Sequence, residues 1–403
     1  MVAGAREDSG RMQSGQPVVP FSEFVLKMNG RCNLDCDYCY LYHSIDPWSA
    51  GSTAMPEEVV AQTCQRIAEH AATHQLPRVR VVFHGGEPLL SGVEPLIRTA
   101  DRLRAALKPG PEVTFTVQTN GVLLTERRIE ALRSAGIRIG VSLDGGRAAT
   151  DRHRRYADGR SSHDKVLRGL AALRRYPDVY AGLLCVIDLD NPPVETYTAL
   201  LEQTPRVIDF LLPHGNWTAP PPGRPADSSA PYGQWLIAVF DRWYQAPQQE
   251  TEVRLFGEII AGLLGGASRS ESIGLSPLGV IVVDTDGALE QVDTLRTTYP
   301  GAVSTPFNVF EHSFDAALAR GAARDRQAGI ESLAEACRAC PVRRVCGGGY
   351  YPHRYRADNG FRNPSVYCSD LFELIRHISR RVHADVERLT ATRDAASVVG
   401  RQS

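Results

Sequence analysis

Long hydrophobic runs are missing from this sequence. No stretch of the 403 residues approaches the ~18 consecutive apolar residues that a membrane-spanning helix requires. The first twenty residues are polar, rich in glycine and proline, and have no apolar segment of the kind found in signal peptides. We therefore expect residues 1–20 to form a disordered N-terminal segment, and we expect a cytoplasmic protein with no membrane partner.

An excess of charge of either sign is missing as well. The chain has 45 Lys and Arg residues against 46 Asp and Glu residues, which gives a formal net charge of −1. This balance provides no basic surface for nucleic acid or for anionic lipid. At ~150 residues per domain, the length of the chain predicts two or three domains, each able to bury a core.

Cysteine is absent from residues 186–336 and concentrated on both sides of that stretch. Three of the nine cysteines lie within residues 32–39, and four lie between residues 337 and 368. In a reducing cytosol such clusters indicate metal or redox chemistry more than disulfides. Cys64 and Cys185 stand alone, one on an amphipathic helical pattern and one in an apolar strand, and we expect both to be core residues.

Short β-branched segments alternate with helical patterns between residues 22 and 245. The alternation predicts βα units around a parallel sheet. Six units fall short of the eight in a complete TIM barrel, so the sheet is either open or a partial (β/α)6 barrel of an α/β protein. The expected strands are residues 23–28, 78–83, 112–117, 137–143, 180–187 and 207–212.

The chemically unusual stretches all follow expected strands. They are CNLDCDYC, HGGEP, QTNG, SLDG and PHGNW. Parallel β/α proteins bind their ligands at the end of the sheet where strands give way to helices. The agreement of five separate stretches predicts one site at that end.

The chain divides by composition into further parts after the barrel, which we place at residues 21–245. Residues 246–270 are expected to form a helical linker, with a helix over 252–264. Residues 271–375 are expected to form a second domain that begins with a hairpin, because Asp286-Gly287 in VIVVDTDGALEQV favours a tight turn. Residues 376–403 should hold the end of a C-terminal helix, expected over 370–390, and a tail.

Cys32, Cys36 and Cys39 have the spacing C-x3-C-x2-C. Three thiolates can hold three irons of a 4Fe–4S cluster and leave the fourth iron open to a small molecule. The alternative is a zinc site with a distant fourth ligand, although zinc sites prefer paired C-x2-C. The motif resembles the radical S-adenosylmethionine (SAM) superfamily, which implies that the open iron holds the amino and carboxylate groups of SAM. One electron then cleaves SAM to methionine and a 5′-deoxyadenosyl radical, and Tyr38 would contact the adenine.

HGGEP, residues 84–88, supports this resemblance. Gly85 and Gly86 allow a close approach of the backbone to a ligand. In the family, Glu87 accepts a hydrogen bond from the methionine ammonium, and Pro88 completes the motif. Other polar residues near the strand ends are candidate SAM contacts, with helix capping, a turn or an exposed position as the alternatives: Gln118, Asn120, Ser142 and Arg154. Asp144 is expected to be a turn residue.

The C-terminal cysteines have the spacing C-x2-C-x5-C-x21-C, for which zinc is again the alternative. The run resembles the SPASM extension of radical SAM peptide-modifying enzymes, which implies a fully coordinated auxiliary 4Fe–4S cluster. The full extension has seven cysteines and two clusters, but this chain has Val292 and Tyr350 at two of those positions. We therefore expect SAM and two 4Fe–4S clusters as cofactors, the auxiliary one held by Cys337, Cys340, Cys346 and Cys368.

Three phrases, LLPHGNW, SPLGVIVVDTDGALEQVD and CGGGYYPHRYRADNGFRNPSVYC, narrow the resemblance to the FxsB-type branch. Its members are cyclophane-forming maturases of ribosomally made peptides, which join an aromatic side chain to the β-carbon of a residue two positions later. The resemblance covers about residues 22–375. It implies two partners, a ribosomally synthesised precursor peptide and an electron donor of the reductase, flavodoxin or ferredoxin type.

The implied reaction removes a β-hydrogen from the peptide, adds the carbon radical to an aromatic ring, and then releases one electron and one proton. The auxiliary cluster is the expected electron acceptor. Asp293 is the candidate base, because sulfatase maturases place a catalytic aspartate at the matching site; an exposed hairpin carboxylate is the alternative. Candidate peptide contacts, with packing or exposure as the alternative, are His214, Asn216, Trp217, Arg354 and Arg356.

Other functions remain open at this level. A sulfatase maturase, which oxidises Ser or Cys to formylglycine, would be favoured by two auxiliary clusters. Thioether formation and peptide epimerisation occur in the same superfamily. A function of a different class is a non-catalytic iron–sulfur or zinc binding module.

Overall fold

The computed structural model describes residues 18–49, 52–224, 227, 229–277, 279–319 and 321–399. The N-terminal segment expected to be disordered, residues 1–20, lies almost wholly outside the described residues. None of the described helices is both long enough and apolar enough to cross a membrane.

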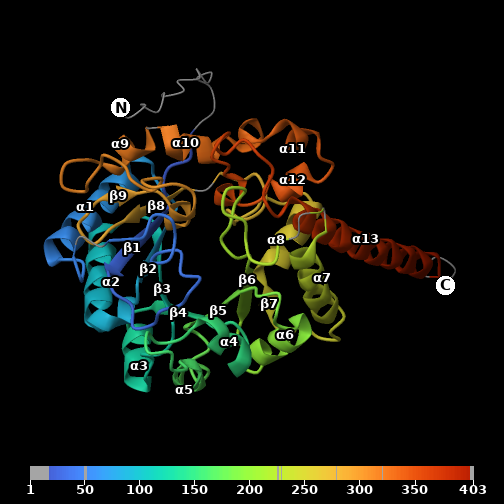
Figure 1. The fold of residues 1–403 in the computed structure, drawn as a ribbon, viewed down its shortest axis with the longest axis horizontal. Coiled ribbons are helices and arrows are strands. Elements are labelled where there is room, and N and C mark those ends of the chain that lie inside the picture. The colour runs from blue at the N-terminus through green and yellow to red at the C-terminus, as the bar shows by residue number, and fades with distance from the viewer. Residues whose placement is uncertain are drawn as a thin grey trace.

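One sheet organises the fold, with the strand order β7-β6-β5-β4-β3-β2-β1-β8-β9 (Figure 1). Neighbouring strands from β1 to β6 are all parallel. The two outer strands of this series do not pair with each other, so the predicted partial barrel is confirmed. The six strands are β1 (Glu23–Asn29), β2 (Arg78–Gly85), β3 (Glu112–Thr119), β4 (Ile137–Ser142), β5 (Tyr180–Val186) and β6 (Val207–Leu211).

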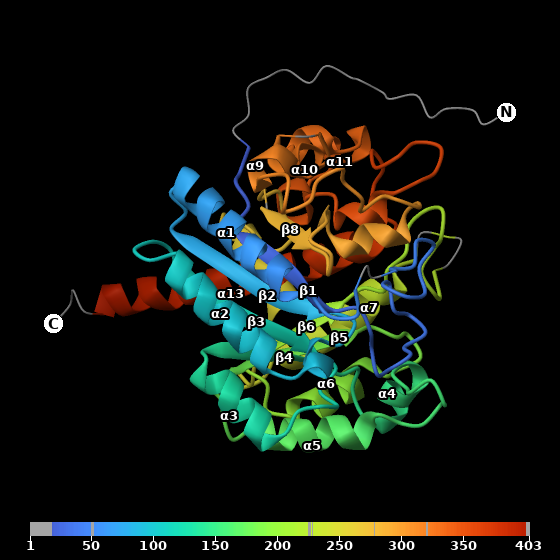
Figure 2. The same cartoon turned by 90° about the vertical axis from the view of Figure 1, so that its left-hand side faces the viewer.

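Helices connect these strands, and α1 to α3 lie along the outer face of the sheet (Figure 2). Apolar side chains of the strands pack beneath them, and Phe24, Val81, Phe83 and Val117 are completely buried. A short helix, α4, was not expected from the sequence. The helices are α1 (Glu57–Thr73), α2 (Glu94–Ala106), α3 (Glu126–Ser134), α4 (Arg147–His153), α5 (His163–Leu173), α6 (Pro193–Leu201) and α7 (Pro231–Tyr244).

The predicted hairpin joins the same sheet instead of standing apart. β8 (Val280–Val283) pairs in parallel with β1, and β9 (Leu289–Glu290) pairs antiparallel with β8. The other edge carries β7 (Glu252–Val253), which leads into α8 (Arg254–Leu263), within the range expected to be helical. The part of the chain that begins at β8 is therefore bonded to the barrel through the β1 edge.

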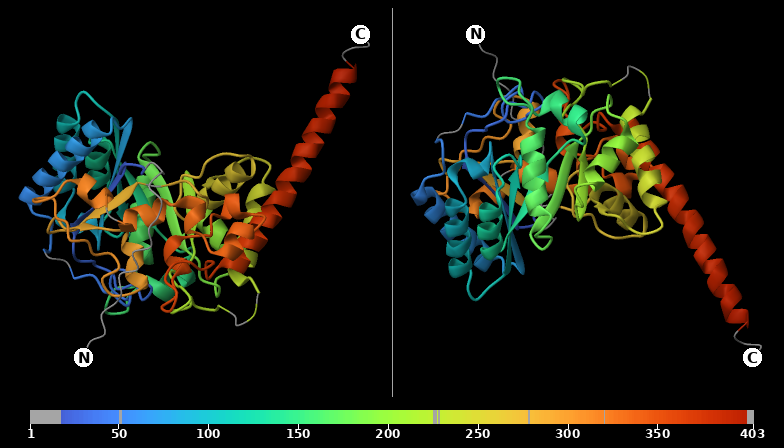
Figure 3. Two further views of the ribbon diagram at one scale, coloured as in Figure 1. Left: turned by 90° about the horizontal axis from the view of Figure 1, so that it is seen from above. Right: turned by 90° about the horizontal axis from the view of Figure 1, so that it is seen from below.

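Short helices follow the hairpin, and one long helix ends the described chain. α13 (Cys368–Val399) packs against α7 and α8, and its far end projects from the body (Figure 3). It runs past residue 390, into the residues expected to form a tail, because no Gly or Pro interrupts it before Gly400. The short helices are α9 (Phe314–Leu318), α10 (Gly321–Gln327), α11 (Glu335–Ala339) and α12 (Arg343–Cys346), with 3₁₀ turns η1 (Pro88–Ser91), η2 (Asp293–Thr297), η3 (Gly329–Ser332) and η4 (Tyr351–Arg354).

Candidate functional site

The carboxyl ends of the parallel strands surround a cavity of about 630 Å³. All five unusual stretches of the sequence contribute to its wall. The contributing residues that the sequence singled out are Cys32, Cys36, Tyr38, Cys39, Gly85, Gly86, Gln118, Asn120, Ser142, Arg154 and His214. The structure therefore brings them together at the end of the sheet where they were expected.

The three N-terminal cysteines lie on the loop between β1 and α1. The backbone N–H of Cys39 donates to the carbonyl of Cys36 at 2.9 Å, which turns the loop back on itself. Burial raises the pKa of Cys32 to about 11 and that of Cys36 to about 12, and neighbouring thiolates add to both shifts. Three thiols that disfavour one another's ionisation suit a cationic iron–sulfur unit, since it would stabilise their thiolate forms.

The distances between the cysteine sulfurs indicate whether a set suits an iron–sulfur cluster or a single zinc ion. Among the described residues, neither cysteine set brings three Sγ atoms within 4.8 Å of one another. A tetrahedral zinc ion with Zn–S bonds of ~2.3 Å would hold its sulfurs roughly 3.8 Å apart. In a 4Fe–4S cluster each sulfur binds a different iron, so wider spacing is required. Both sets therefore fit the larger group better than zinc.

The two glycines of HGGEP let the end of β2 press against the cysteine loop. The N–H of Gly86 donates to the carbonyl of Asn29, and the N–H of Glu87 donates to the carbonyl of Arg31, both at 2.8 Å. A Cβ atom on Gly86 would lie 2.3 Å from the Arg31 oxygen, and Gly85 has a φ of +119°. Side chains at these positions would separate the loop from the strand.

Glu87 is buried in the wall between β2 and β3. Its carboxylate accepts hydrogen bonds from Leu89 N at 3.0 Å, Thr119 Oγ1 at 2.8 Å and Asn120 N at 2.8 Å. It is only 1% exposed, and burial raises its pKa. The side chain thus braces the strand ends, while the backbone of Gly85 and Gly86 faces the cavity; its contact with the methionine ammonium stays a prediction.

Tyr38 belongs to a buried chain of polar groups that crosses the cavity wall. Arg154 Nη1 donates to the Tyr38 hydroxyl at 2.8 Å, and that hydroxyl donates to Asp144 Oδ2. Asp144 also accepts from Val186 N at 3.0 Å and is 2% exposed. The expectation that Asp144 is only a turn residue is therefore wrong: a carboxylate at the end of β4 fixes Tyr38 from across the barrel.

Arg154 is 8% exposed, so the alternative of an exposed arginine does not hold. Its Nε has no hydrogen-bond partner among the residues that the structure describes. A buried guanidinium with a free N–H at a cavity wall suits a carboxylate ligand. Gln118 and Asn120 are already bonded within the wall, the first to Ser142 Oγ at 3.0 Å and the second to Asn33 Oδ1 at 2.8 Å.

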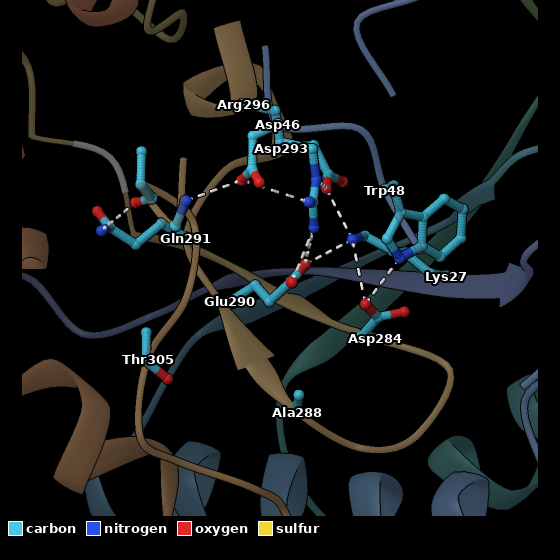
Figure 4. Close-up of polar contacts among 12 residues, drawn as sticks. Lys27, Asp46, Trp48, Asp284, Ala288, Glu290, Gln291, Asp293, Arg296 and Thr305 are labelled. Carbon is cyan, nitrogen blue, oxygen red and sulfur yellow. Dashed lines mark hydrogen bonds and ion pairs between the residues drawn. The ribbon is translucent and has the colours of Figure 1, made fainter. Parts of the chain in front are cut away.

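Asp293 lies in a buried ion network with Lys27, which the sequence analysis did not single out (Figure 4). Lys27 Nζ is 2.7 Å from Asp293, 2.5 Å from Glu290 and 3.5 Å from Asp284. Arg296 contacts Glu290 at 2.8 Å and Asp293 at 3.3 Å. Asp293 is 6% exposed, so the alternative of an exposed hairpin carboxylate is wrong. The one local signal for Lys27 was a charged residue inside an apolar strand.

His84 connects this network to the cavity. It lines the cavity and is the cross-strand partner of Lys27 in the β1–β2 pairing. Its Nδ1 is buried without a hydrogen-bond partner among the described residues. Burial lowers the pKa of His84, while the charge of Asp293 acts in the opposite direction. A neutral imidazole thus stands at the cavity wall beside the ion network.

Two candidate peptide contacts next to His214 already form hydrogen bonds within the protein. Asn216 is completely buried, and its side chain donates to Thr297 O at 2.8 Å and accepts from two N–H groups of its own turn. Trp217 donates from Nε1 to Pro364 O at 2.7 Å. Asn216 therefore joins the loop after β6 to η2, and Trp217 joins it to the stretch before α13. His214 is the one of the three that lines the cavity.

The C-terminal cysteines converge from three helices. Cys337 lies on α11 and Cys340 directly follows that helix, while α12 ends at Cys346 and α13 begins at Cys368. Burial raises the pKa of Cys346 to about 12, and Cys368 and Cys337 raise it further. Burial also raises the pKa of Cys337, to which the charge of Cys340 adds, and the pKa of Cys368, to which Cys337 and Cys340 both add. Their convergence fits a fully coordinated cluster.

Arg354 is buried beside this set, whereas Arg356 is exposed. Arg354 Nη2 donates to the carbonyls of Gly347 and Gly349, both at 2.7 Å, and so holds the glycine turn that follows Cys346. Arg356 forms an exposed ion pair with Asp358. The geometry favours support of the cysteine turn by Arg354 over contact with a peptide.

Apolar packing occupies the positions where the full extension has cysteines. Val292 is buried in a small cluster with Leu295, Ala302 and Val303. The Tyr350 hydroxyl lies 2.6 Å from Thr294 Oγ1. Neither position offers a thiolate for an iron–sulfur cluster.

Residues 26–198 match the Radical SAM superfamily. The chain is 25% identical over 389 residues to the serine-type anaerobic sulfatase-maturating enzyme of Klebsiella pneumoniae, a match that covers 94% of this chain and 93% of that protein. It is 24% identical over 378 residues to the cysteine-type anaerobic sulfatase-maturating enzyme of Clostridium perfringens (strain 13 / Type A). That match covers 90% of this chain and 97% of that protein.

Solved structures share the fold. "Native anSMEcpe with bound AdoMet and Cp18Cys peptide" matches with a TM-score of 0.77 at 21% identity, over 91% of this chain and 99% of that chain. "Crystal structure of Streptococcus suis SuiB bound to precursor peptide SuiA" matches with a TM-score of 0.57 at 15% identity, over 87% of this chain and 76% of that chain. The fold and the site thus define a partial-barrel iron–sulfur protein. Residues 26–198 form a domain similar to the radical SAM superfamily, and the chain as a whole shares the fold of these structures. That family implies SAM and 4Fe–4S clusters as cofactors, and the two cysteine sets supply thiols for the clusters.

Proposed function

We propose that this protein is a radical SAM enzyme that crosslinks a ribosomally made peptide, joining the β-carbon of one residue to an aromatic ring as a three-residue cyclophane. One observation carries the proposal: the three-cysteine loop, HGGEP and His214 share a single cavity, and a four-cysteine set lies in the same chain. Reductive cleavage of SAM supplies a radical able to take hydrogen from an unactivated carbon. The two relatives are named for maturing sulfatases, and the titles of the two structures name bound peptides.

The residues of this chain would act around that chemistry. Gly85 and Gly86 present backbone groups to the methionine moiety of SAM, and Arg154 receives its carboxylate. Tyr38, held by Asp144, faces the adenine. Leu184, Leu211 and other apolar residues of the cavity would exclude water from the substrate side chain.

Formation of formylglycine is the second candidate, because the curated relatives described above are sulfatase-maturating enzymes. Against it stand Val292 and Tyr350, which leave this chain with one auxiliary cysteine set. Cyclophane formation needs an acceptor for one electron after ring addition, which one auxiliary cluster can supply. We therefore place the crosslink first.

Co-expression with the product of the neighbouring small open reading frame tests this choice. A crosslink and the oxidation of serine both remove two hydrogens, so mass alone does not separate them. A crosslinked peptide will resist fragmentation between the joined residues and will not react with a hydrazide. A formylglycine peptide will fragment normally and form a hydrazone, and that outcome would replace the proposed reaction.

We propose Asp293 as the acceptor of the proton released on rearomatisation, with His84 as the cavity-lining group next to it. Asp293→Asn should still cleave SAM but lower crosslinked product at least tenfold. Glu290→Gln, in the same ion network, is the matched control and should retain most of the activity. Equal losses in both variants would assign the effect to the network instead of Asp293, and unchanged turnover would remove Asp293 from the mechanism.

A non-catalytic metal module is the alternative of another class. Anaerobic reconstitution separates it from the enzyme: we expect about eight irons per chain and formation of 5′-deoxyadenosine from SAM. Zinc in both cysteine sets, without SAM cleavage, would overturn the proposed function.

A further inference from the structure

Two histidines and an aspartate meet on the side of the barrel opposite the cavity. His70 and His74 lie near the C-terminal end of α1, and Asp315 lies in the first turn of α9. A spacing of four residues places both imidazoles on one face of the helix. His74 Nε2 is 2.5 Å and His70 Nδ1 is 3.1 Å from the same oxygen, Asp315 Oδ1. None of the three lines the cavity.

His70 is the buried member of this group. It is 1% exposed, and the rings of Phe21, Phe24 and Phe314 surround it at centroid distances of 5.8, 6.2 and 6.0 Å. Its polar neighbours are the Asp315 carboxylate, 3.1 Å from Nδ1, and the backbone of Phe21. The contact with Asp315 falls short of a well-aligned hydrogen bond. A metal ion beside Nδ1 would be shared by the imidazole and the Asp315 carboxylate.

The protein covers this group only in part. His74 and Asp315 are 29% and 40% exposed at their side chains, so the group is closed by the protein on one side and open to water on the other.

We propose that His70 Nδ1, His74 Nε2 and Asp315 Oδ1 bind one divalent first-row metal ion, with zinc as the best match and water as the remaining ligand. These three ligand atoms all lie within 4.8 Å of one another. Two imidazole nitrogens and one carboxylate oxygen form a borderline donor set that zinc favours, and calcium and magnesium prefer oxygen alone. This compact set contrasts with the two wider cysteine sets.

The ion would connect two parts of the chain that are far apart in sequence. α1 belongs to the barrel, and α9 belongs to the segment that leads toward Cys337 (Figure 2). A shared ion would fix the position of α9 on α1 without entering the reaction. The expected consequence is a gain in stability on metal binding, as for any ligand that binds only the folded state.

The test measures zinc on the protein with both clusters in place. Zinc retained after desalting is counted by elemental analysis, and affinity is measured in competition with a chromophoric chelator. We expect one zinc per wild-type chain and at least tenfold weaker binding in His74→Gln and Asp315→Asn. The matched control is His383→Gln on α13, where the imidazole pairs with Glu387 four residues on, and it should bind zinc like the wild type.

Two further readouts make the outcome decisive. Zinc-edge X-ray absorption should show nitrogen and oxygen ligands, and zinc should raise the unfolding temperature of the wild type but not of Asp315→Asn. Unchanged iron content shows that the variants are folded. Sulfur ligands, equal zinc binding in the wild type and both variants, or no binding by the wild type would overturn the site.

Discussion

Lys27 shows how strongly a single buried charge depends on its surroundings. Its side chain is fully buried at the end of β1, and three carboxylates lie within 3.5 Å of its ammonium group. The Trp48 ring also lies 4.4 Å from the nitrogen. Burial acts to lower the pKa of Lys27, but the carboxylates more than compensate and raise it overall. Lys27 is therefore charged, and it holds Asp293, Glu290 and Asp284 together.

Removing this charge should destabilise the protein strongly. Lys27→Met leaves three buried carboxylates with Arg296 as their nearest cation, and we expect a loss of about 3–5 kcal/mol in the free energy of unfolding. Urea unfolding measures it. Lys165→Met, at an exposed position of α5, is the control and should change stability by less than about 0.5 kcal/mol. Equal midpoints for the two variants would contradict the importance of the network.

The lowered pKa of His214 predicts that acid reduces the stability of the folded protein. Burial at the cavity wall lowers the pKa of His214 from 6.5 to about 4. In the unfolded chain the imidazole binds a proton near its ordinary pKa, but in the folded protein it stays neutral until about pH 4. The stability that His214 contributes is therefore present above pH 6.5 and is lost as the pH falls toward 4.

Comparison with His214→Phe isolates this contribution. Between pH 7.5 and pH 5 the urea concentration at the midpoint of unfolding should fall further for the wild type than for the variant. The reason is that phenylalanine takes up no proton in the unfolded state. His84, His70 and His353 also have lowered pKa values, so both proteins should lose some stability. Equal losses would show that His214 does not contribute.

At the scale of elements, the hairpin of β8 and β9 depends on its turn. Gly287 has a φ of +85°, and a Cβ atom there would lie 2.8 Å from Val309 Cγ2. Gly159 has a similar φ of +81°, but a Cβ atom there would meet nothing within 4 Å. The two positions share the backbone strain and differ in packing.

Alanine substitutions at these two glycines separate strain from packing. In each variant the free energy of unfolding should fall by about 1–2 kcal/mol, because alanine disfavours the left-handed backbone conformation. Gly287→Ala should lose at least a further ~1 kcal/mol because the turn must move away from Val309. Urea unfolding measures both, and equal losses would show that the turn packs more loosely than the structure indicates.

For the whole molecule, the two cysteine sets form separate sites on one chain. The first set lies on a single loop, but the second depends on α13 reaching the short helices. Asp370, on the first turn of α13, accepts a hydrogen bond from Gly233 N of α7 at 2.9 Å. The docking of α13 on α7 thus places Cys368 near the other three cysteines.

Removal of one set should therefore leave the other intact. With Cys32, Cys36 and Cys39 all replaced by alanine, we expect about four of about eight irons to remain and SAM cleavage to be lost. Iron analysis and detection of 5′-deoxyadenosine measure the two effects. Loss of all iron would show that the auxiliary site does not assemble without the first cluster.

The sequence predicted the parts of this protein that depend on local spacing. The six strands were predicted because β-branched runs show their period within a few residues, and the motifs could be placed because each follows its strand directly. Cys64 and Cys185, expected in the core, are 2% and 0% exposed. The role of Asp144 was misjudged because this carboxylate acts on Tyr38, which is 106 residues away. α4 was missed because it is one short helix.

By itself, then, the sequence determined the partial barrel, the two cysteine sets and the end of the sheet where the first set lies, since backbone preference and ligand spacing are local properties. Only the tertiary structure decided which charges share a buried site. Lys27 and Glu290 are separated by 263 positions, and the pairing of β8 with β1 brings them together. His70 and Asp315 meet because α9 packs on α1. The sequence shows that such residues exist, but the pairing of charges removed from water is set by long-range packing.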